Sequence, residues 1–270
     1  MISIIITTKN EEQHINKCLQ SIKEQTYPKE KVEVIVVDNN SSDKTKEIAQ
    51  KYGVRFFNAG IERSAQRNFG ARQAQNEILL FLDADMILSP GVVTEIIDKM
   101  QNQNLKGLHL NEKILGNTFF SKVRSFEREF YFNTLIDAVR CVRKTDFQKI
   151  NGFDESLTGP EDWDFDKRIR QLGKTDLLSA VVYHNEEYLN LKKLLKKKKY
   201  YSQNFKIYIQ KWGKQDSDIK KQLGFKYRYI QVFFEKGKYK KVLQHPLLFI
   251  SLIFLKTLIG IVYLLNKKDG

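Results

Sequence analysis

The first hundred residues alternate two patterns of apolar positions. Short runs in which nearly every residue is apolar, such as 2–8 and 32–38, are typical of strands that are buried on both faces. Between these runs, Ile15, Leu19 and Ile22 recur at helical spacing, and later segments repeat the pattern. The sequence therefore predicts strands over 2–8, 32–38, 54–58 and 77–85, and helices over 10–25, 41–53, 63–74 and 89–100.

Two polar residues sharpen the predicted helix starts. Asn10 is expected to cap the first helix, and Ser89 before Pro90 is a preferred start for the fourth. Strands that alternate with helices predict an α/β domain whose parallel sheet is covered on both faces. The less regular part that follows predicts strands over 106–115, 138–144 and 177–184, and helices over 117–135 and 159–173.

The formal net charge of +14 is concentrated in one segment. Residues 1–187 carry 26 Lys and Arg against 28 Asp and Glu, whereas residues 188–243 carry 17 against three. Because this basic segment leads directly into an apolar stretch, we interpret it as a surface for anionic lipids and not for nucleic acid. Cys18 and Cys141 lie far apart, which predicts no disulfide framework and favours a reducing compartment.

The C-terminal part has the composition of a membrane-associated extension. Residues 188–243 mix lysines with Leu, Tyr, Phe and Ile, as interfacial amphipathic helices do. Residues 246–265 are mostly apolar and near the length of a bilayer span, but Lys256 at the midpoint disfavours a span. A span, a hydrophobic hairpin and an interfacial helix all remain open.

This composition divides the chain into an N-terminal α/β domain, a basic amphipathic helical segment and an apolar membrane-associated tail, over 1–187, 188–243 and 244–270. The lysines favour the cytoplasmic face of the membrane, because basic segments next to a membrane stay on that side.

Polar side chains gather where three predicted strands end. Thr8 and Glu11 follow the first strand, Asp38 ends the second, and Asp83 and Asp85 end the fourth. Because ligands of open parallel sheets bind beyond the carboxyl ends of the strands, we expect these residues to line one crevice.

Asp83 and Asp85 are separated by one residue and are expected on the same face of an extended chain. Two such carboxylates suit a hard cation, Mn²⁺ or Mg²⁺, that also holds phosphate oxygens. The simpler alternative is a turn with an Asp that caps the next helix. The buried strand before the pair and the other polar strand ends favour the cation.

Five ordered segments resemble the signature blocks of family 2 glycosyltransferases: "IIITTKNEE", "VVDNNSSDKT", "RSAQRNFGARQA", "FLDADM" and "GPEDWDF". The resemblance covers residues 2 to about 185. It implies the GT-A fold, a Rossmann-like mixed sheet flanked by helices. It also implies a nucleotide-diphosphate sugar as donor and inversion of the anomeric centre.

The resemblance implies a role for each matching donor-site residue. Thr8, Glu11 and Asp38 would contact the base and ribose of a UDP- or GDP-linked sugar, and Arg67 would lie near the diphosphate, with Arg63 as the competing candidate. Three of these residues also have a simpler alternative role. Glu11 would be an acid that complements the helix dipole, Asp38 would form a turn, and Arg67 would be a solvated arginine on a helix.

The metal would be held at the end of the fourth strand. Asp85 would bind the ion that bridges both phosphates, Asp83 would face the ribose or the metal, and His184 would lie near them. The alternative for His184 is a structural histidine.

The block "GPEDWDF" implies the acceptor side of the site. Asp162 would be the catalytic base, Glu161 would orient the acceptor, and Trp163 would offer an aromatic face to a sugar ring. Three acids within four residues are expected to raise one another's pKa, which suits a base that works near neutrality. The alternative is an acidic helix N-terminus that only complements the helix dipole.

These features predict a metal-dependent inverting glycosyltransferase acting on a lipid-linked glycan or another cell-surface precursor. Two alternatives remain. A polyprenyl phosphate acceptor is already anionic and needs no base, so Asp162→Asn would be nearly harmless. A non-catalytic nucleotide-sugar-binding membrane protein is disfavoured, because the donor, metal and base positions are all filled.

Overall fold

The computed structural model describes residues 1–132, 134–187, 190–202 and 204–268, and the chain groups into two units. Unit 1 comprises Met1–Glu112 and Ala138–Asn185, and unit 2 comprises Lys113–Asp137 and Glu186–Gly270. The sequence-based division at residue 187 therefore differs in placing 113–137 in the first domain. Positions 188–189 and 203 of the predicted basic segment and 269–270 of the predicted tail lie outside the described residues.

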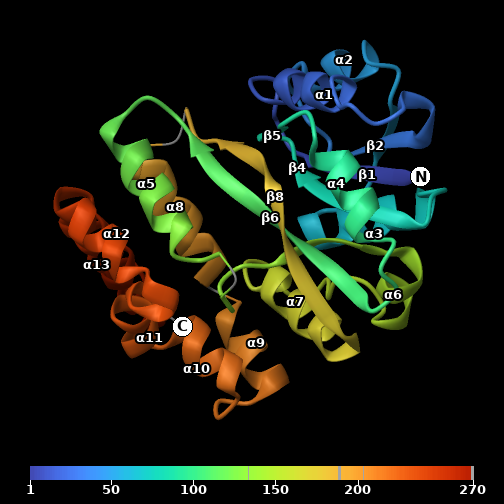
Figure 1. Ribbon diagram of the computed structural model, residues 1–270. Coiled ribbons are helices and arrows are strands. Elements are labelled where there is room, and N and C mark those ends of the chain that lie inside the picture. The colour runs from blue at the N-terminus through green and yellow to red at the C-terminus, as the bar shows by residue number, and fades with distance from the viewer. Residues whose placement is uncertain (133, 188–189, 203, 269–270) are drawn as a thin grey trace. The chain divides into compact units, whose positions relative to one another are not determined.

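Within the described residues, unit 1 is built on an eight-stranded sheet in the order β3-β2-β1-β4-β7-β6-β8-β5 (Figure 1). Strands β1 to β4 pair in parallel, while β4 with β7, β6 with β7, and β5 with β8 pair antiparallel. The sheet is therefore mixed, as the family resemblance implied. The strands are β1 (Ile2–Thr8), β2 (Val32–Asp38), β3 (Arg55–Asn58), β4 (Ile78–Asp83), β5 (Met86–Leu88), β6 (Leu105–Leu115), β7 (Val139–Arg143) and β8 (Lys174–Asn185).

Helices cover both faces of this sheet because its central strands are apolar on both sides. Ile4 and Ile6 pack with α1, α2 and α4, while Ile5 packs on the opposite face, where α3, α6 and α7 supply apolar side chains. These helices are α1 (Ile15–Lys23), α2 (Thr45–Gln50), α3 (Arg63–Gln73), α4 (Val92–Lys99), α6 (Lys144–Lys149) and α7 (Glu161–Leu172).

The strand register places the polar strand ends side by side. Thr8 at the end of β1 lies opposite Asp38 of β2, and Thr7 lies opposite Asp83 of β4. Three strand ends that are separated in sequence thus meet at one edge of the sheet, as the sequence predicted.

Two predicted helix starts are wrong. α1 begins at Ile15, with His14 at its N-cap, and α4 begins at Val92. Asn10 instead has a left-handed φ of 55°, and its Oδ1 accepts a hydrogen bond from the Ser42 backbone N–H at 2.9 Å. Its side chain therefore joins the loop after β1 to the loop after β2 instead of capping a helix.

Unit 2 is helical in its described part, apart from the last three residues of β6. Its elements are α5 (Phe119–Glu129), α8 (Leu191–Ser202), α9 (Phe205–Trp212), α10 (Ser217–Leu223), α11 (Phe225–Tyr229), η2 (Gln231–Phe233), η3 (Glu235–Gly237), α12 (Tyr239–Gln244) and α13 (Pro246–Lys268). α13 contacts both α5 and α8, and Leu252 and Leu255 on its inner face are buried.

The predicted apolar tail therefore forms one long helix that packs on its own unit. None of the helices in the described part of the chain has the length and apolar character that a bilayer span requires.

Candidate active site

The ends of β1 and β2 form the first part of the site. Thr8 Oγ1 donates to Asp38 Oδ1 at 2.7 Å, and both residues are almost fully buried. The Ser41 backbone N–H and hydroxyl also donate to the Asp38 carboxylate. The Gln66 amide donates to the carbonyls of Thr8 and Val37, so a helix side chain fixes both strand ends.

Glu11 lies in the loop between β1 and α1. Its backbone N–H donates to Thr45 Oγ1 at 2.8 Å, and its carboxylate lies 2.7 Å from His14 Nδ1. The first turn of α1 contains no acid, so Glu11 does not serve as a first-turn residue complementing the helix dipole. These contacts hold Glu11 against the start of α2, which follows the β2 loop.

Two arginines join a residue predicted for the donor side to one predicted for the acceptor side. Arg67 of α3 is fully buried, and its guanidinium donates to Asp83 at 3.0 Å and to Asp162 at 2.7 Å. Arg140 of β7 lies 3.5 Å from Asp83 Oδ2 and 3.3 Å from Asp162 Oδ2. Arg67 is thus no solvated helix residue, and the predicted Asp83, Arg67 and Asp162 are brought together.

A third arginine, Arg63, pairs with Glu161, the acid next to Asp162. Arg63 Nη2 donates to Glu161 Oε1 at 2.9 Å, and its Nη1 lies 3.9 Å from Asp83 Oδ2. Glu161 is almost fully buried and also accepts from the Gly159 backbone N–H. Trp163 follows in the first turn of α7 and is half-buried. Arg63 and Arg67 therefore do not compete for one place, since each pairs with its own acid of α7.

The arginines set opposite pKa shifts on the two neighbouring acids. Burial alone would raise the pKa of Asp162, but the charges of Arg140 and Arg67 outweigh it and lower that pKa. Burial raises the pKa of Glu161, and Arg63 offsets this only in part. The expectation that clustered acids raise the pKa of Asp162 is therefore wrong, because the guanidinium charges dominate over the neighbouring carboxylates.

The pKa of Asp83 is lowered more strongly than that of Asp162. Burial opposes its charged form, but Arg140, Arg67 and Arg63 hold the pKa of this carboxyl well below its ordinary value. Asp83 is therefore a fixed anion at neutral pH. It is held in the same arginine cluster as Asp162.

Asp85 faces a different set of partners. β4 ends at Asp83 and residues 84–85 form a turn, so the predicted extended chain with both carboxylates on one face is wrong. Asp85 Oδ2 lies 3.0 Å from His184 Nε2, and His184 Nδ1 lies 3.7 Å from Glu112 Oε2. Burial would lower the pKa of His184, but Asp85 and Glu112 raise it to about 10.

The Asp85–His184 pair fits a divalent cation that shares a diphosphate. In the part of the chain that the structure describes, no group of three or more His, Cys, Asp or Glu side chains is arranged to hold a metal. One carboxylate oxygen and one imidazole nitrogen are nevertheless donors that Mn²⁺ accepts, and such ions often complete their ligands with substrate phosphates and water. The Asp85 carboxylate therefore fits Mn²⁺ or Mg²⁺, and His184 would add a nitrogen ligand once it has lost the proton that Asp85 and Glu112 help it to hold.

Three residues of the site were missed in the sequence: Gln66, Glu112 and Arg140. Arg140 had a signal, because it interrupts the apolar predicted strand "AVRCVRK", where an unpaired arginine would be costly. Gln66 and Glu112 had none, because each acts on strand ends that are distant in sequence.

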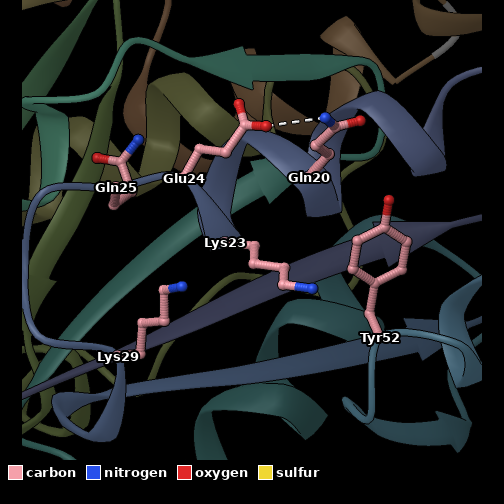
Figure 2. A pocket seen from close by; sticks show the side chains of 6 residues that line it. All are labelled: Gln20, Lys23, Glu24, Gln25, Lys29 and Tyr52. Atoms are coloured by element: carbon pink, nitrogen blue, oxygen red, sulfur yellow. Dashed lines mark hydrogen bonds between the residues drawn. The ribbon is translucent and has the colours of Figure 1, made fainter.

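A surface hollow of about 400 Å³ also lies in unit 1 (Figure 2). It is lined by Gln20, Lys23, Glu24, Gln25, Lys29 and Tyr52. None of the predicted donor or acceptor residues lines it, and the Gln20 amide donates to the Glu24 carboxylate within it. The hollow is therefore separate from the candidate active site.

Comparisons with known proteins show the family of the chain. The family described as glycosyl transferase family 2 matches residues 3–146. Glycosyltransferase AglE of Haloferax volcanii is 46% identical over 91 residues, which are 31% of this chain and 30% of AglE. The chain thus matches less than a third of this relative's length.

Two further proteins are similar. A Methanococcus voltae dolichyl N-acetyl-alpha-D-glucosaminyl phosphate 3-beta-D-2,3-diacetamido-2,3-dideoxy-beta-D-glucuronosyltransferase is 38% identical over 93 residues, covering 31% of this chain and 28% of that protein. The mannosyltransferase PcManGT of Pyrobaculum calidifontis, solved with GDP-Man and Mn²⁺, superposes with a TM-score of 0.67 at 16% identity, covering 100% of this chain and 87% of its own. That structure shares the fold. The family match spans more than half of the chain, and the chain therefore belongs to glycosyl transferase family 2.

Proposed function

We propose that the protein is a metal-dependent inverting glycosyltransferase that moves a sugar from a nucleotide diphosphate to a lipid-linked glycan or another cell-surface precursor. The observation that carries this proposal is the pairing of Arg67 and Arg140 with both Asp83 and Asp162. One cluster thus links the expected donor side to the expected base.

The donor side has a residue for each part of a nucleotide sugar. Thr8, Glu11 and Asp38 hold the base and ribose through groups already fixed at the strand ends. Arg67 and Arg140 bind the diphosphate, since guanidinium groups form bidentate pairs with phosphate oxygens. Asp85 and His184 would hold Mn²⁺ or Mg²⁺, and the ion would offset charge on the departing diphosphate.

The acceptor side supplies the proton transfer. Asp162 takes the proton from the acceptor hydroxyl while that oxygen forms a bond to the anomeric carbon and the bond to the diphosphate breaks. Attack from the face opposite the diphosphate inverts the centre. A diphosphate that competes for Arg67 and Arg140 strengthens Asp162 as a base, because these two charges lower its pKa.

Two relatives support the substrate classes. PcManGT was solved with GDP-Man and Mn²⁺, which supports a nucleotide-sugar donor, UDP- or GDP-linked, and a divalent metal. The Methanococcus voltae enzyme has a dolichyl-linked acceptor in its name, which supports a lipid-linked acceptor. The basic residues of 188–243 support a location at the cytoplasmic face of the membrane.

A panel of UDP- and GDP-sugars, with and without Mn²⁺ or Mg²⁺, tests the proposal when combined with polyprenyl-linked acceptors. We expect metal-dependent release of the nucleotide diphosphate and a glycosylated lipid. Asp85→Asn should weaken metal-dependent donor binding in calorimetry. If no nucleotide sugar is bound or consumed under any condition, the proposal fails and the non-catalytic alternative gains support.

The polyprenyl phosphate acceptor remains the second candidate, because pairing with two arginines makes Asp162 a weak base. The variant Asp162→Asn distinguishes a hydroxyl acceptor from a polyprenyl phosphate acceptor. Loss of transfer by about 10²- to 10⁴-fold with intact donor binding supports a hydroxyl acceptor. Nearly unchanged transfer to polyprenyl phosphate supports the alternative.

A further inference from the structure

Helix α13 buries Lys256 near its midpoint and exposes several of its large apolar side chains. Four large side chains, Leu247, Ile250, Phe254 and Ile261, are 74%, 64%, 66% and 48% exposed. Their spacing of three, four and seven residues places them along one face of the helix. We call these four residues the apolar ridge. Lys256, by contrast, is only 4% exposed.

Contacts within unit 2 fix the rotation of α13. Lys256 Nζ donates to Tyr131 Oη at 3.1 Å and to the Arg228 carbonyl at 2.6 Å, and it lies over the rings of Tyr229 and Phe233. Because this lysine has its partners inside unit 2, α13 cannot turn the apolar ridge inward without losing them.

Elements of unit 2 that precede α13 also expose large apolar side chains. Leu243, at the end of α12, is 74% exposed, and Phe225 and Phe234 in the preceding short helices are similarly exposed. Monomeric proteins rarely expose large contiguous apolar surfaces without an interaction that uses them. In Figure 1, α12 and α13 are the red elements of this unit.

The positive charge of residues 219–268 favours an anionic partner. Between residues 219 and 268 the chain contains one acid, Glu235, whose carboxylate accepts from Tyr227 Oη. Exposed lysines, including Lys226, Lys236 and Lys240, lie in the same stretch. Apolar side chains flanked by lysines complement an anionic lipid surface, where each lysine gains from nearby headgroups and the apolar groups reach the acyl boundary.

We propose that α13 lies in the plane of an anionic bilayer surface, with the apolar ridge inserted at the headgroup boundary and Lys256 facing the protein. The inference rests on the membrane association in the proposed function and assigns it to one surface. Of the three arrangements that the sequence left open, it selects the interfacial helix, which touches one leaflet.

Flotation of the full chain with vesicles tests this assignment. Wild-type protein should float with phosphatidylglycerol vesicles and less well with neutral phosphatidylcholine. Leu247→Glu/Phe254→Glu should weaken partitioning about a hundredfold, since burying a Leu or Phe side chain contributes roughly tenfold or more. The matched control Phe119→Glu/Ile207→Glu changes two exposed apolar residues of the same unit and should float like wild type.

Three outcomes overturn the inference: no flotation of the wild type, equal flotation of the ridge variant, or a ridge variant that changes only the oligomeric state in light scattering. Nucleotide-sugar hydrolysis without lipid should be equal in all variants. Loss of that activity in the wild type would contradict the proposed function and leave the docking result intact.

Probe depth distinguishes a surface helix from a span. Cys18 and Cys141 are buried, so single cysteines at 247, 254 and 261 can be labelled selectively with an environment-sensitive fluorophore. Lipid quenchers should place all three probes at the same shallow depth. Depths that change steadily from 247 to 261 would indicate a span and contradict the proposal.

Discussion

At the residue scale, Arg67 holds the candidate site together. It is fully buried, its guanidinium lies 5.0 Å from the Phe153 ring, and it pairs with both Asp83 and Asp162. Removing one partner of a buried ion pair costs about 3–5 kcal/mol, because the other charge stays buried and uncompensated. Any Arg67 variant therefore mixes a folding effect with a functional one.

Arg140, which is also buried, allows a second test of the arginine cluster, with urea unfolding to confirm that the variant is folded. Arg140→Met removes one of the two guanidinium groups next to Asp162 and one of the three near Asp83, and it leaves Arg67 in place. We expect about 100-fold weaker binding of UDP or GDP, which corresponds to about 2.7 kcal/mol. Titration calorimetry in the presence of Mn²⁺ measures this directly.

Arg140→Lys serves as the control for charge. It keeps the cation but not the planar fork, so it should recover part of the lost affinity. Unchanged nucleotide affinity in Arg140→Met would show that this arginine does not contact the diphosphate.

At the scale of elements, α3 is placed by its close approach to the sheet. A Cβ on Gly70 would lie 2.4 Å from Ile5 Cγ2 and 3.2 Å from Val37 Cγ2. Gly70 therefore lets α3 lie directly on β1 and β2, one turn after Arg67. The position of the arginine depends on this contact.

Gly70→Ala should lower the free energy of unfolding by about 1–3 kcal/mol, because the added methyl group forces α3 away from β1 and β2. Donor affinity should fall as well, since Arg67 moves with the helix. Urea unfolding checks the first effect. Gly91→Ala, where a Cβ would meet nothing within 4 Å, should change stability by less than about 0.5 kcal/mol. Equal effects of the two substitutions would contradict the role given to Gly70.

The elements show what the sequence could and could not predict. The buried strands were predictable because their apolar runs are local, and the meeting of Thr8, Asp38 and Asp83 followed from parallel pairing. The start of α1 was not predictable, because Asn10 bonds to Ser42, which lies 32 residues away in the sequence.

The pKa of Asp162 could not be predicted either, because it too depends on residues that are distant in sequence. It depends on Arg67 and Arg140, which reach it from α3 and β7. The acids beside it in sequence were visible, but the more influential charges come from distant segments. The grouping of 113–137 with the C-terminal part likewise follows from packing and has no local signal.

At the scale of the whole molecule, a buried acid in unit 2 should contribute to acid sensitivity. Burial would raise the pKa of Glu127, but Arg124, Lys256, a hydrogen bond from Tyr131 and the charge of Lys198 lower it to about 2. A carboxyl with a depressed folded-state pKa stabilises the fold above its unfolded pKa near 4.5, and this stability is lost as pH falls toward 2.

The contribution of Glu127 is about 3 kcal/mol at neutral pH, from the difference between the folded and unfolded pKa. Glu127→Gln should therefore be less stable at pH 7 and lose less stability between pH 5 and 3 than the wild type. Urea unfolding across this range measures the difference. Glu129→Gln, in the same helix but partly exposed, should keep the wild-type slope. Parallel pH profiles for wild type and Glu127→Gln would contradict the assignment.

The burial of Lys256 has a practical consequence for preparing the protein. Shortening the chain before Pro246 to remove apolar residues would also remove the cation that donates to Tyr131 Oη and the Arg228 carbonyl. It would expose the surfaces of α5 and α8 that α13 covers. Polar substitutions at Leu247 and Phe254 keep those contacts, so they offer a better route to concentrated, detergent-free samples for crystallisation.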